Sequence, residues 1–202
     1  MNRIIAYLFV ALAFWSCQKG EDDPFLSLKT RKARLVGEWK LDSYSYSNSD
    51  GLLSQANWSD GEMTYLNVDS TELKTEFNWT ITFDTEGKYE SEQVEKFDAD
   101  TVAGTEEYTE TRIEKGEWQF SGGNSTKRKS ALLLVLEEEQ KTRSDQGSNV
   151  DLVTYSGLNT GALYQLNRLS KEDLWMSYSI ETNFAFGSVT EELTVKFKKK
   201  GS

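Results

Sequence analysis

Histidine is absent from this sequence of 202 residues, and cysteine and proline each occur once. Without histidine the chain lacks the commonest general base, the commonest metal ligand and any His-dependent catalytic triad. The single cysteine, Cys17, excludes an intrachain disulfide, so the fold must depend on its core. The single proline, Pro24, lies near the N-terminus. The long proline-free segment after it is typical of paired strands, in which proline would remove a hydrogen-bond donor.

Motifs for catalysis and for nucleic-acid binding are also missing. The chain has no G-x-S-x-G and no glycine-rich phosphate loop. A net charge of −10, with only short basic clusters at 127–129 and 198–200, argues against a nucleic-acid partner. Acidic residues near Asp98 and Glu106 lack the spacing of an EF-hand. Pairs among the 33 acidic residues arise by chance and do not indicate a glycosidase. We therefore expect no enzyme activity, no metal site and no cofactor.

The first residues have the order of a secretory signal. Arg3 is followed by an apolar run over residues 4–15, which is too short to span a bilayer, and then by Ser16 and Cys17. A small residue before a cysteine at this place predicts the lipid attachment site of a bacterial lipoprotein. The alternative is cleavage after the A-x-A sequence at 11–13, which would leave Cys17 as a free thiol.

An acidic segment, QKGEDD at 18–23, follows the cysteine. It resembles the export signal that sends lipoproteins of Bacteroidota to the outer face of the outer membrane. The alternative is that these charges only keep a tether solvated. We expect a signal peptide at 1–16, an acidic tether at 17–29 and one folded domain at 30–202. The membrane is then a partner through the lipid on Cys17, and the expected location is the outer membrane, either cell-surface exposed or facing the periplasm.

Alternating apolar and polar residues predict strands over most of the folded domain. The clearest strand is 77–83, and the turn at 84–87 joins it to a partner strand at 88–97. Residues 48–61 are rich in Ser, Asn, Asp and Gly and predict a long loop. About eight to ten strands with short turns, and no stretch with helical periodicity, indicate an antiparallel sandwich or barrel.

Four segments resemble those of the lipocalin-like (calycin-type) lipoproteins of Bacteroidota, and together they span roughly residues 30–198. They are LVGEWKL at 35–41, WTITFD at 79–84, GEWQF at 116–120 and YQLNRLS at 164–170. The resemblance implies a lipocalin-like antiparallel β-barrel. The first segment contains the G-x-W signature, in which Trp39 closes one end of the barrel and Gly37 allows the first strand to pack closely.

Two functions fit such a barrel. The first is a non-catalytic binding module for a small apolar ligand, and the candidate lining residues are Trp79, Phe83, Tyr164, Trp175 and Tyr178. The alternative for these aromatic residues is that they simply fill the interior.

The second function is a surface interaction or glycan-contact protein with a filled barrel. Trp58, in the predicted loop, would stack on a sugar or else fold back onto the barrel. Ser70 and Thr101 stand in short sequences that resemble the O-glycosylation sequon of some Bacteroidota, which makes both residues candidates for glycans.

Overall fold

The fold is taken from a computed structural model that describes residues 30–49, 53–99, 106–122, 130–146, 150–155, 161–184 and 187–201. The expected signal peptide, the tether with Cys17, and Thr101 lie outside the described residues. No helix in the described ranges is long and apolar enough to cross a membrane.

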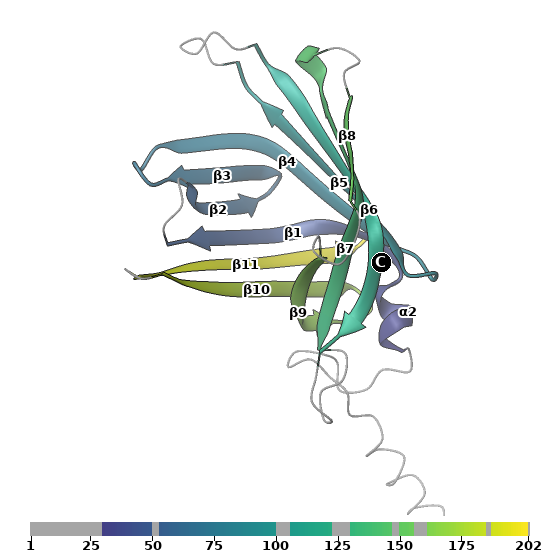
Figure 1. Cartoon of the computed structure of the whole chain (residues 1–202). Coiled ribbons are helices and arrows are strands. Elements are labelled where there is room, and N and C mark those ends of the chain that lie inside the picture. Colours follow the sequence, from purple (N-terminus) through teal and green to yellow (C-terminus); the bar gives the residue numbers. More distant parts are fainter. Residues whose placement is uncertain are drawn as a thin grey trace, which may run out of the picture.

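A short helix and eleven antiparallel strands make up the described part of the chain (Figure 1). The helix is α2 (Arg31–Leu35), and a 3-10 turn, η1 (Ser144–Gln146), follows β7. The strands are β1 (Gly37–Asn48), β2 (Leu53–Ser59), β3 (Glu62–Asn67), β4 (Glu72–Phe83), β5 (Lys88–Phe97), β6 (Tyr108–Ser121), β7 (Ala131–Arg143), β8 (Val150–Thr154), β9 (Gly161–Leu169), β10 (Asp173–Phe184) and β11 (Gly187–Lys199).

The sheet closes on itself. Its order is β6-β5-β4-β3-β2-β1-β11-β10-β9-β7-β8, and β6 also pairs with β7 along its length. Ten strands therefore form a closed antiparallel barrel, and β8 is an extra strand on β7. The predicted all-β barrel is confirmed, and the choice between sandwich and barrel is decided by the β6–β7 pairing.

A hairpin widens one end of this barrel. At the other end β1 pairs directly with β4, from Gly37 opposite Phe83 to Lys40 opposite Thr80. Farther along, the β2–β3 hairpin separates these two strands and inserts two further strands between them. Positive φ angles of 53° at Asp60 and 95° at the following glycine form its two-residue turn.

This hairpin corrects the prediction of a loop over 48–61. Residues 53–59 are a strand, because Ala56 and Trp58 pack toward the core while polar neighbours face out. The polar composition reflects a strand with one solvated face, not a loop.

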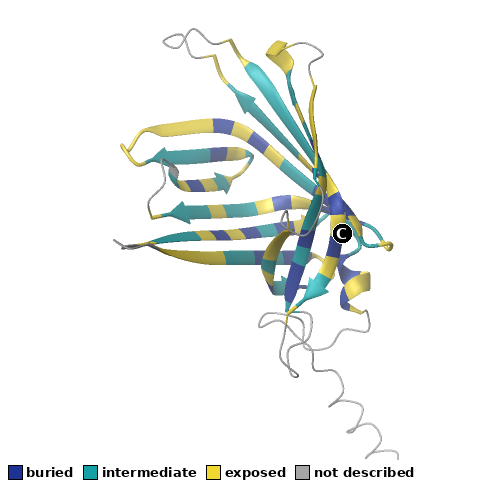
Figure 2. Cartoon of the chain, in the orientation of Figure 1, coloured by how far each residue is buried: buried dark blue, intermediate teal, exposed yellow. Residues whose placement is uncertain are grey.

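The narrow end is closed by a dense core and by α2. Trp39 and Leu35 are fully buried, and the Trp39 indole Nε1 donates to the Leu35 carbonyl at 2.7 Å. Lys199 Nζ lies 4.8 Å from the centre of the Trp39 ring and donates to the carbonyls of Arg34 (2.8 Å) and Val36 (2.6 Å). These bonds fix α2 over the barrel end. Figure 2 shows buried residues concentrated in this region.

At the wide end the strands do not form a continuous hydrogen-bonded wall. Strand β7 pairs with β9 over 131–135 and with β8 over 138–142, whereas β9 pairs with β10 only over 174–177. In the described part of the chain, β8 and the outer half of β10 therefore each have one edge without a paired strand. These two edges border the same gap in the barrel wall. Leu152 of β8 is 58% exposed and Ile180 of β10 is 52% exposed.

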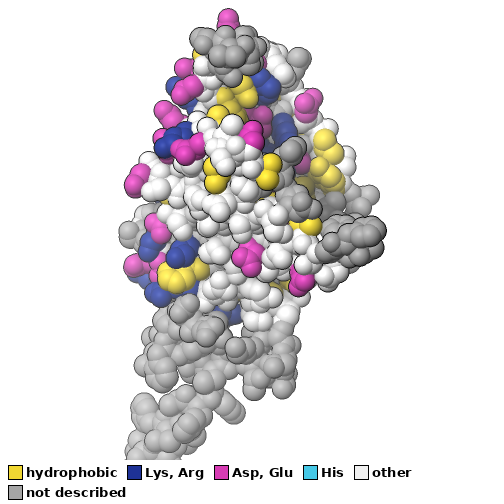
Figure 3. Space-filling view, turned by 90° about the vertical axis from the view of Figure 1, so that its left-hand side faces the viewer, with side chains coloured by type: hydrophobic (Ala, Val, Ile, Leu, Met, Phe, Trp, Pro, Cys, Tyr) yellow, Lys and Arg dark blue, Asp and Glu magenta, His cyan; other side chains and the backbone are white. Residues whose placement is uncertain are grey.

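The two parts of the wall diverge toward the wide end. In Figure 1 the far ends of β5, β6 and β8 lie away from those of β1, β10 and β11. Figure 3 looks from the left-hand side of Figure 1 and shows hydrophobic side chains exposed among polar and acidic ones. The strands thus spread apart at the wide end, whereas α2 and the core close the narrow end.

Candidate functional site

A cavity of about 360 Å³ lies inside the barrel beyond the closed-end core. Aromatic side chains from β1, β3, β4, β9 and β10 form much of its wall: Tyr44, Tyr65, Phe77, Trp79, Tyr164 and Tyr178. Two acidic side chains and one arginine also line it: Glu95, Arg112 and Glu114. The site therefore brings aromatic side chains and charged groups together in one partly open cavity.

Three of the five candidate lining residues meet in this cavity. Trp79 lies between the cavity and the core, since its indole Nε1 donates to Ser91 Oγ at 2.8 Å and its ring meets Phe197 edge-on at 5.1 Å. Tyr164 and Tyr178 stand side by side with ring centres 5.9 Å apart. These two tyrosines come from β9 and β10, so the sheet, and not the sequence spacing, brings them together.

The other two candidates lie elsewhere. Phe83 is 1% exposed in the closed-end core, where it contacts Trp118 edge-on at 6.0 Å. Trp175 is on the outer surface, between Arg168 and Lys196, whose charges lie 4.9 and 4.6 Å from its ring centre. The reason is strand alternation: Leu174 and Met176 point inward, so the residue between them points out. Trp175 is therefore not a lining residue.

Two of the lining tyrosines, Tyr44 and Tyr65, were not predicted from the sequence. Tyr44 follows a β-bulge between Leu41 and Ser43, which shifts the alternation by one residue and turns Tyr44 inward. Tyr65 is in β3, a strand within the segment that follows the predicted loop. A bulge leaves no reliable mark in the sequence, whereas the apolar-aromatic alternation of Met63 and Tyr65 was an available signal.

Glu95 and Glu191 accept hydrogen bonds from tyrosine hydroxyls at the cavity. Glu95 Oε1 accepts from the hydroxyls of Tyr65 (2.8 Å) and Thr75 (2.6 Å). Glu191 Oε1 accepts from Tyr178 at 2.5 Å. Burial, and then the nearby carboxylate, raise the pKa of Tyr65 and of Tyr178 above the ordinary tyrosine value. The phenols therefore keep their protons and act as donors.

Burial also raises the pKa of the two other lining tyrosines. It brings the pKa of Tyr44 and of Tyr164 to about 12, with nearby tyrosine and glutamate side chains adding to the shift. The cavity therefore has a neutral phenol wall throughout the physiological pH range.

Arg112 is held between two carboxylates. Its Nη2 lies 2.8 Å from Glu114 Oε1, and its Nε lies 3.0 Å from Glu139 Oε1. Lys141 and the Tyr155 hydroxyl also contact Glu139, at 3.4 and 2.9 Å. Burial raises the pKa of Glu114, although Arg112 opposes this shift. Burial would also raise the pKa of Glu139, but Tyr155, Arg112 and Lys141 together lower it.

Trp58 and Ser70 have different surroundings. Trp58 is partly buried in β2, and its indole Nε1 donates to the Phe77 carbonyl at 2.8 Å. The side chain is therefore tied to the barrel wall and does not project from a loop. Ser70 is exposed in the turn between β3 and β4, with a φ of 65°.

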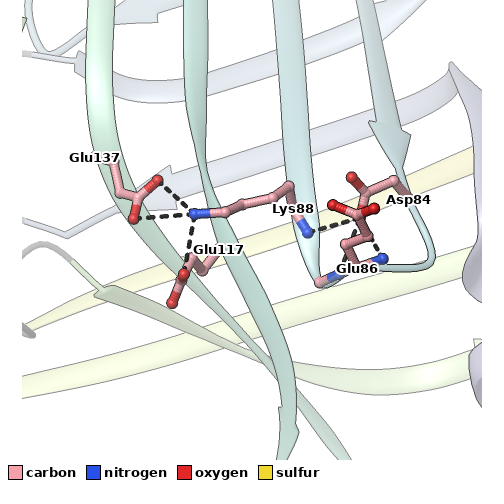
Figure 4. Close-up of polar contacts among 6 residues, drawn as sticks. Asp84, Glu86, Lys88, Glu117 and Glu137 are labelled. Atoms are coloured by element: carbon pink, nitrogen blue, oxygen red, sulfur yellow. Dashed lines mark hydrogen bonds and ion pairs between the residues drawn. The ribbon is translucent and has the colours of Figure 1, made fainter.

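An outer hollow of about 470 Å³ lies over the β4–β5 turn and the adjoining strands. Figure 4 shows its polar contacts: Lys88 Nζ lies 2.9 Å from Glu117 and 3.1 Å from Glu137, and Asp84 Oδ1 accepts from the backbone N–H groups of residues 86–88 at 2.8 Å each. The first set is an exposed ion-pair network, and the second closes the turn. Both explain local structure without requiring a ligand.

No protein-family model matches the sequence, and a search of curated proteins finds no match. Within the described residues, no group of three or more His, Cys, Asp or Glu side chains is arranged to hold a metal ion.

Proposed function

We propose that this protein is a non-catalytic binding module of the lipocalin-like lipoprotein kind, held at the outer membrane by a lipid on Cys17, and that its barrel takes up one small ligand. The observation that carries the proposal is the cavity of about 360 Å³ lined by six aromatic side chains. Its volume falls in the range of small-molecule sites, and its wall exposes more polar than apolar atoms.

The lining changes the expected chemistry of the ligand. A purely apolar ligand would leave Glu95, Glu114 and Arg112 without water and without new partners. A ligand with both an apolar part and a polar part would fit the aromatic wall and also meet these groups. The proposal is therefore an amphipathic or aromatic ligand that carries a polar group.

The alternative of a glycan-contact surface has less support. It depended on Trp58, whose indole is hydrogen-bonded to the barrel backbone. An aromatic side chain held in this way presents only part of its ring for stacking.

Native mass spectrometry of the protein purified from its own kind of cell tests for a bound molecule at one per chain. Titration with the neutral fluorescent probe N-phenyl-1-naphthylamine then tests the cavity directly. We expect saturable binding that Tyr164→Ala weakens at least five-fold, because the substitution removes a wall of the cavity. Trp175→Ala, on the outer face of β10, is the matched control and should bind normally. Absence of a bound molecule in native mass spectrometry together with absence of saturable probe binding by folded protein, or equal probe binding by the two variants, would refute the proposal.

A further inference from the structure

We infer that the ligand is an organic cation, such as a quaternary ammonium compound, held by the aromatic wall and by the carboxylate of Glu95. This inference rests on the proposed function, since it names the chemical class that the same cavity would take.

The first support is the composition of the wall. Tyr44, Tyr65, Trp79, Tyr164 and Tyr178 come from five strands and surround one cavity, so a bound group would meet aromatic side chains from several directions. The faces of such rings carry negative charge density and attract cations, and the attraction grows when water is excluded. Trp79 and Tyr44 already stand edge-to-face, with centres 6.4 Å apart, which holds these two side chains in place.

The second support is the balance of charge. In the described part of the chain the polar partners of Glu95 and Glu191 are hydroxyl groups, which carry no positive charge. Arg112, the cation of the cavity wall, is already paired with Glu114 and Glu139. Among the described residues of the cavity wall, carboxylate charge therefore remains that no side-chain cation pairs with. In a region partly shielded from water such charge attracts a cation more strongly than at the surface.

The third support is the direction of the hydrogen bonds. The Tyr65 hydroxyl donates a hydrogen bond to Glu95, and the Tyr178 hydroxyl donates one to Glu191. A phenol that donates to a carboxylate has a more electron-rich oxygen and ring, because hydrogen bonds in a chain polarise one another. An anionic ligand would meet these oxygens and carboxylates unfavourably, whereas a cation would be stabilised by them.

The test compares two probes of the same shape. Choline and its neutral carbon analogue 3,3-dimethylbutan-1-ol differ by one charge, and their affinities are measured by isothermal titration calorimetry at low salt. We expect choline to bind at least ten-fold more tightly, with an affinity that falls as salt is added. Glu95→Gln should reduce choline affinity at least five-fold, since it removes the charge but keeps an acceptor for Tyr65. Glu92→Gln, on the exposed face of the same strand, is the matched control and should change little.

The outcomes separate this inference from the proposed function. Equal affinity for the two probes, or unchanged choline affinity in Glu95→Gln, would overturn the cation inference. Binding of N-phenyl-1-naphthylamine without any binding of choline would also overturn it, while the proposed binding function would stand. Circular dichroism and binding of N-phenyl-1-naphthylamine test whether Glu95→Gln is folded. If it is, a loss of choline binding is due to the removed charge.

Discussion

Lys199→Met should destabilise the closed end of the barrel far more than the same change at the next residue. Lys199 Nζ donates to two backbone carbonyls, those of Arg34 and Val36, and lies 4.8 Å from the centre of the Trp39 ring. Methionine keeps most of the aliphatic stem but removes the charge and the donors. Each carbonyl left without a partner costs about 1–3 kcal/mol, and the lost cation–π contact about 0.5–2 kcal/mol. Water reaches the exposed carbonyls in part and lowers the total cost, so we expect the free energy of unfolding to fall by about 3 kcal/mol.

Lys200→Met is the matched control. Lys200 pairs with Glu38 at 2.7 Å on the surface, and its side chain is 66% exposed. An exposed ion pair of this kind contributes below about 1 kcal/mol. The two substitutions are chemically identical and adjacent, so the difference between them isolates the contacts at the closed end.

Equilibrium unfolding in urea, followed by tryptophan fluorescence and by circular dichroism, measures both variants. A lower midpoint with an unchanged slope would mean a lower free energy of unfolding without a change in the exposed area. Lys199→Arg should recover part of the loss, because it keeps a charge over Trp39. If Lys199→Met and Lys200→Met agree within about 0.5 kcal/mol, the contacts of Lys199 do not stabilise the barrel end and the reasoning fails.

Three other results are expected. Gly116→Ala should lower the free energy of unfolding by about 2 kcal/mol or more in the same urea assay, because an added Cβ would lie 2.0 Å from the Val135 carbonyl oxygen. A change near zero would contradict this prediction. The pKa of Tyr44 and of Tyr164 is raised to about 12, so their contribution to the free energy of unfolding is present below pH 10 and is lost as the pH rises toward 12. Phenolate absorbance should show tyrosines that titrate at high pH, and Tyr164→Phe should reduce this late part of the titration. Burial would raise the pKa of Asp173, but its lysine and serine partners lower it overall. Its contribution to stability is therefore present above the ordinary aspartate pKa and is lost as the pH falls through the lowered pKa. Asp173→Asn should weaken the dependence of the free energy of unfolding on pH in the acid range.

Strand alternation made much of the fold predictable. The run from Phe77 to Phe83 alternates inward and outward in β4 as expected, and its hairpin with β5 follows from the turn at 84–87. The same rule would have removed Trp175 from the lining residues, because Tyr178 on the same strand points inward and three positions separate them. Alternation therefore specifies the face on which a residue lies as long as the strand has no bulge.

Interruptions of alternation were not predictable. The bulge after Leu41 turns Tyr44 toward the cavity, and the β2–β3 hairpin forms in a segment whose composition resembles a loop. Both depend on neighbouring strands that supply hydrogen-bond partners, and those partners are distant in the sequence. The contact between Arg112 and Glu139 likewise depends on the register of β6 against β7.

The sequence by itself determined that the folded domain is built of antiparallel strands and that it has neither a histidine-based site nor an intrachain disulfide. These properties follow from composition and from a period of two residues, which act locally along the chain. Only the tertiary structure decided that one barrel end is filled and the other holds a cavity, because the difference comes from the inserted hairpin and from which strands close the ring. It also decided that Glu95 faces an aromatic wall with hydroxyl partners, since side chains from separate strands meet there only after the sheet has curved.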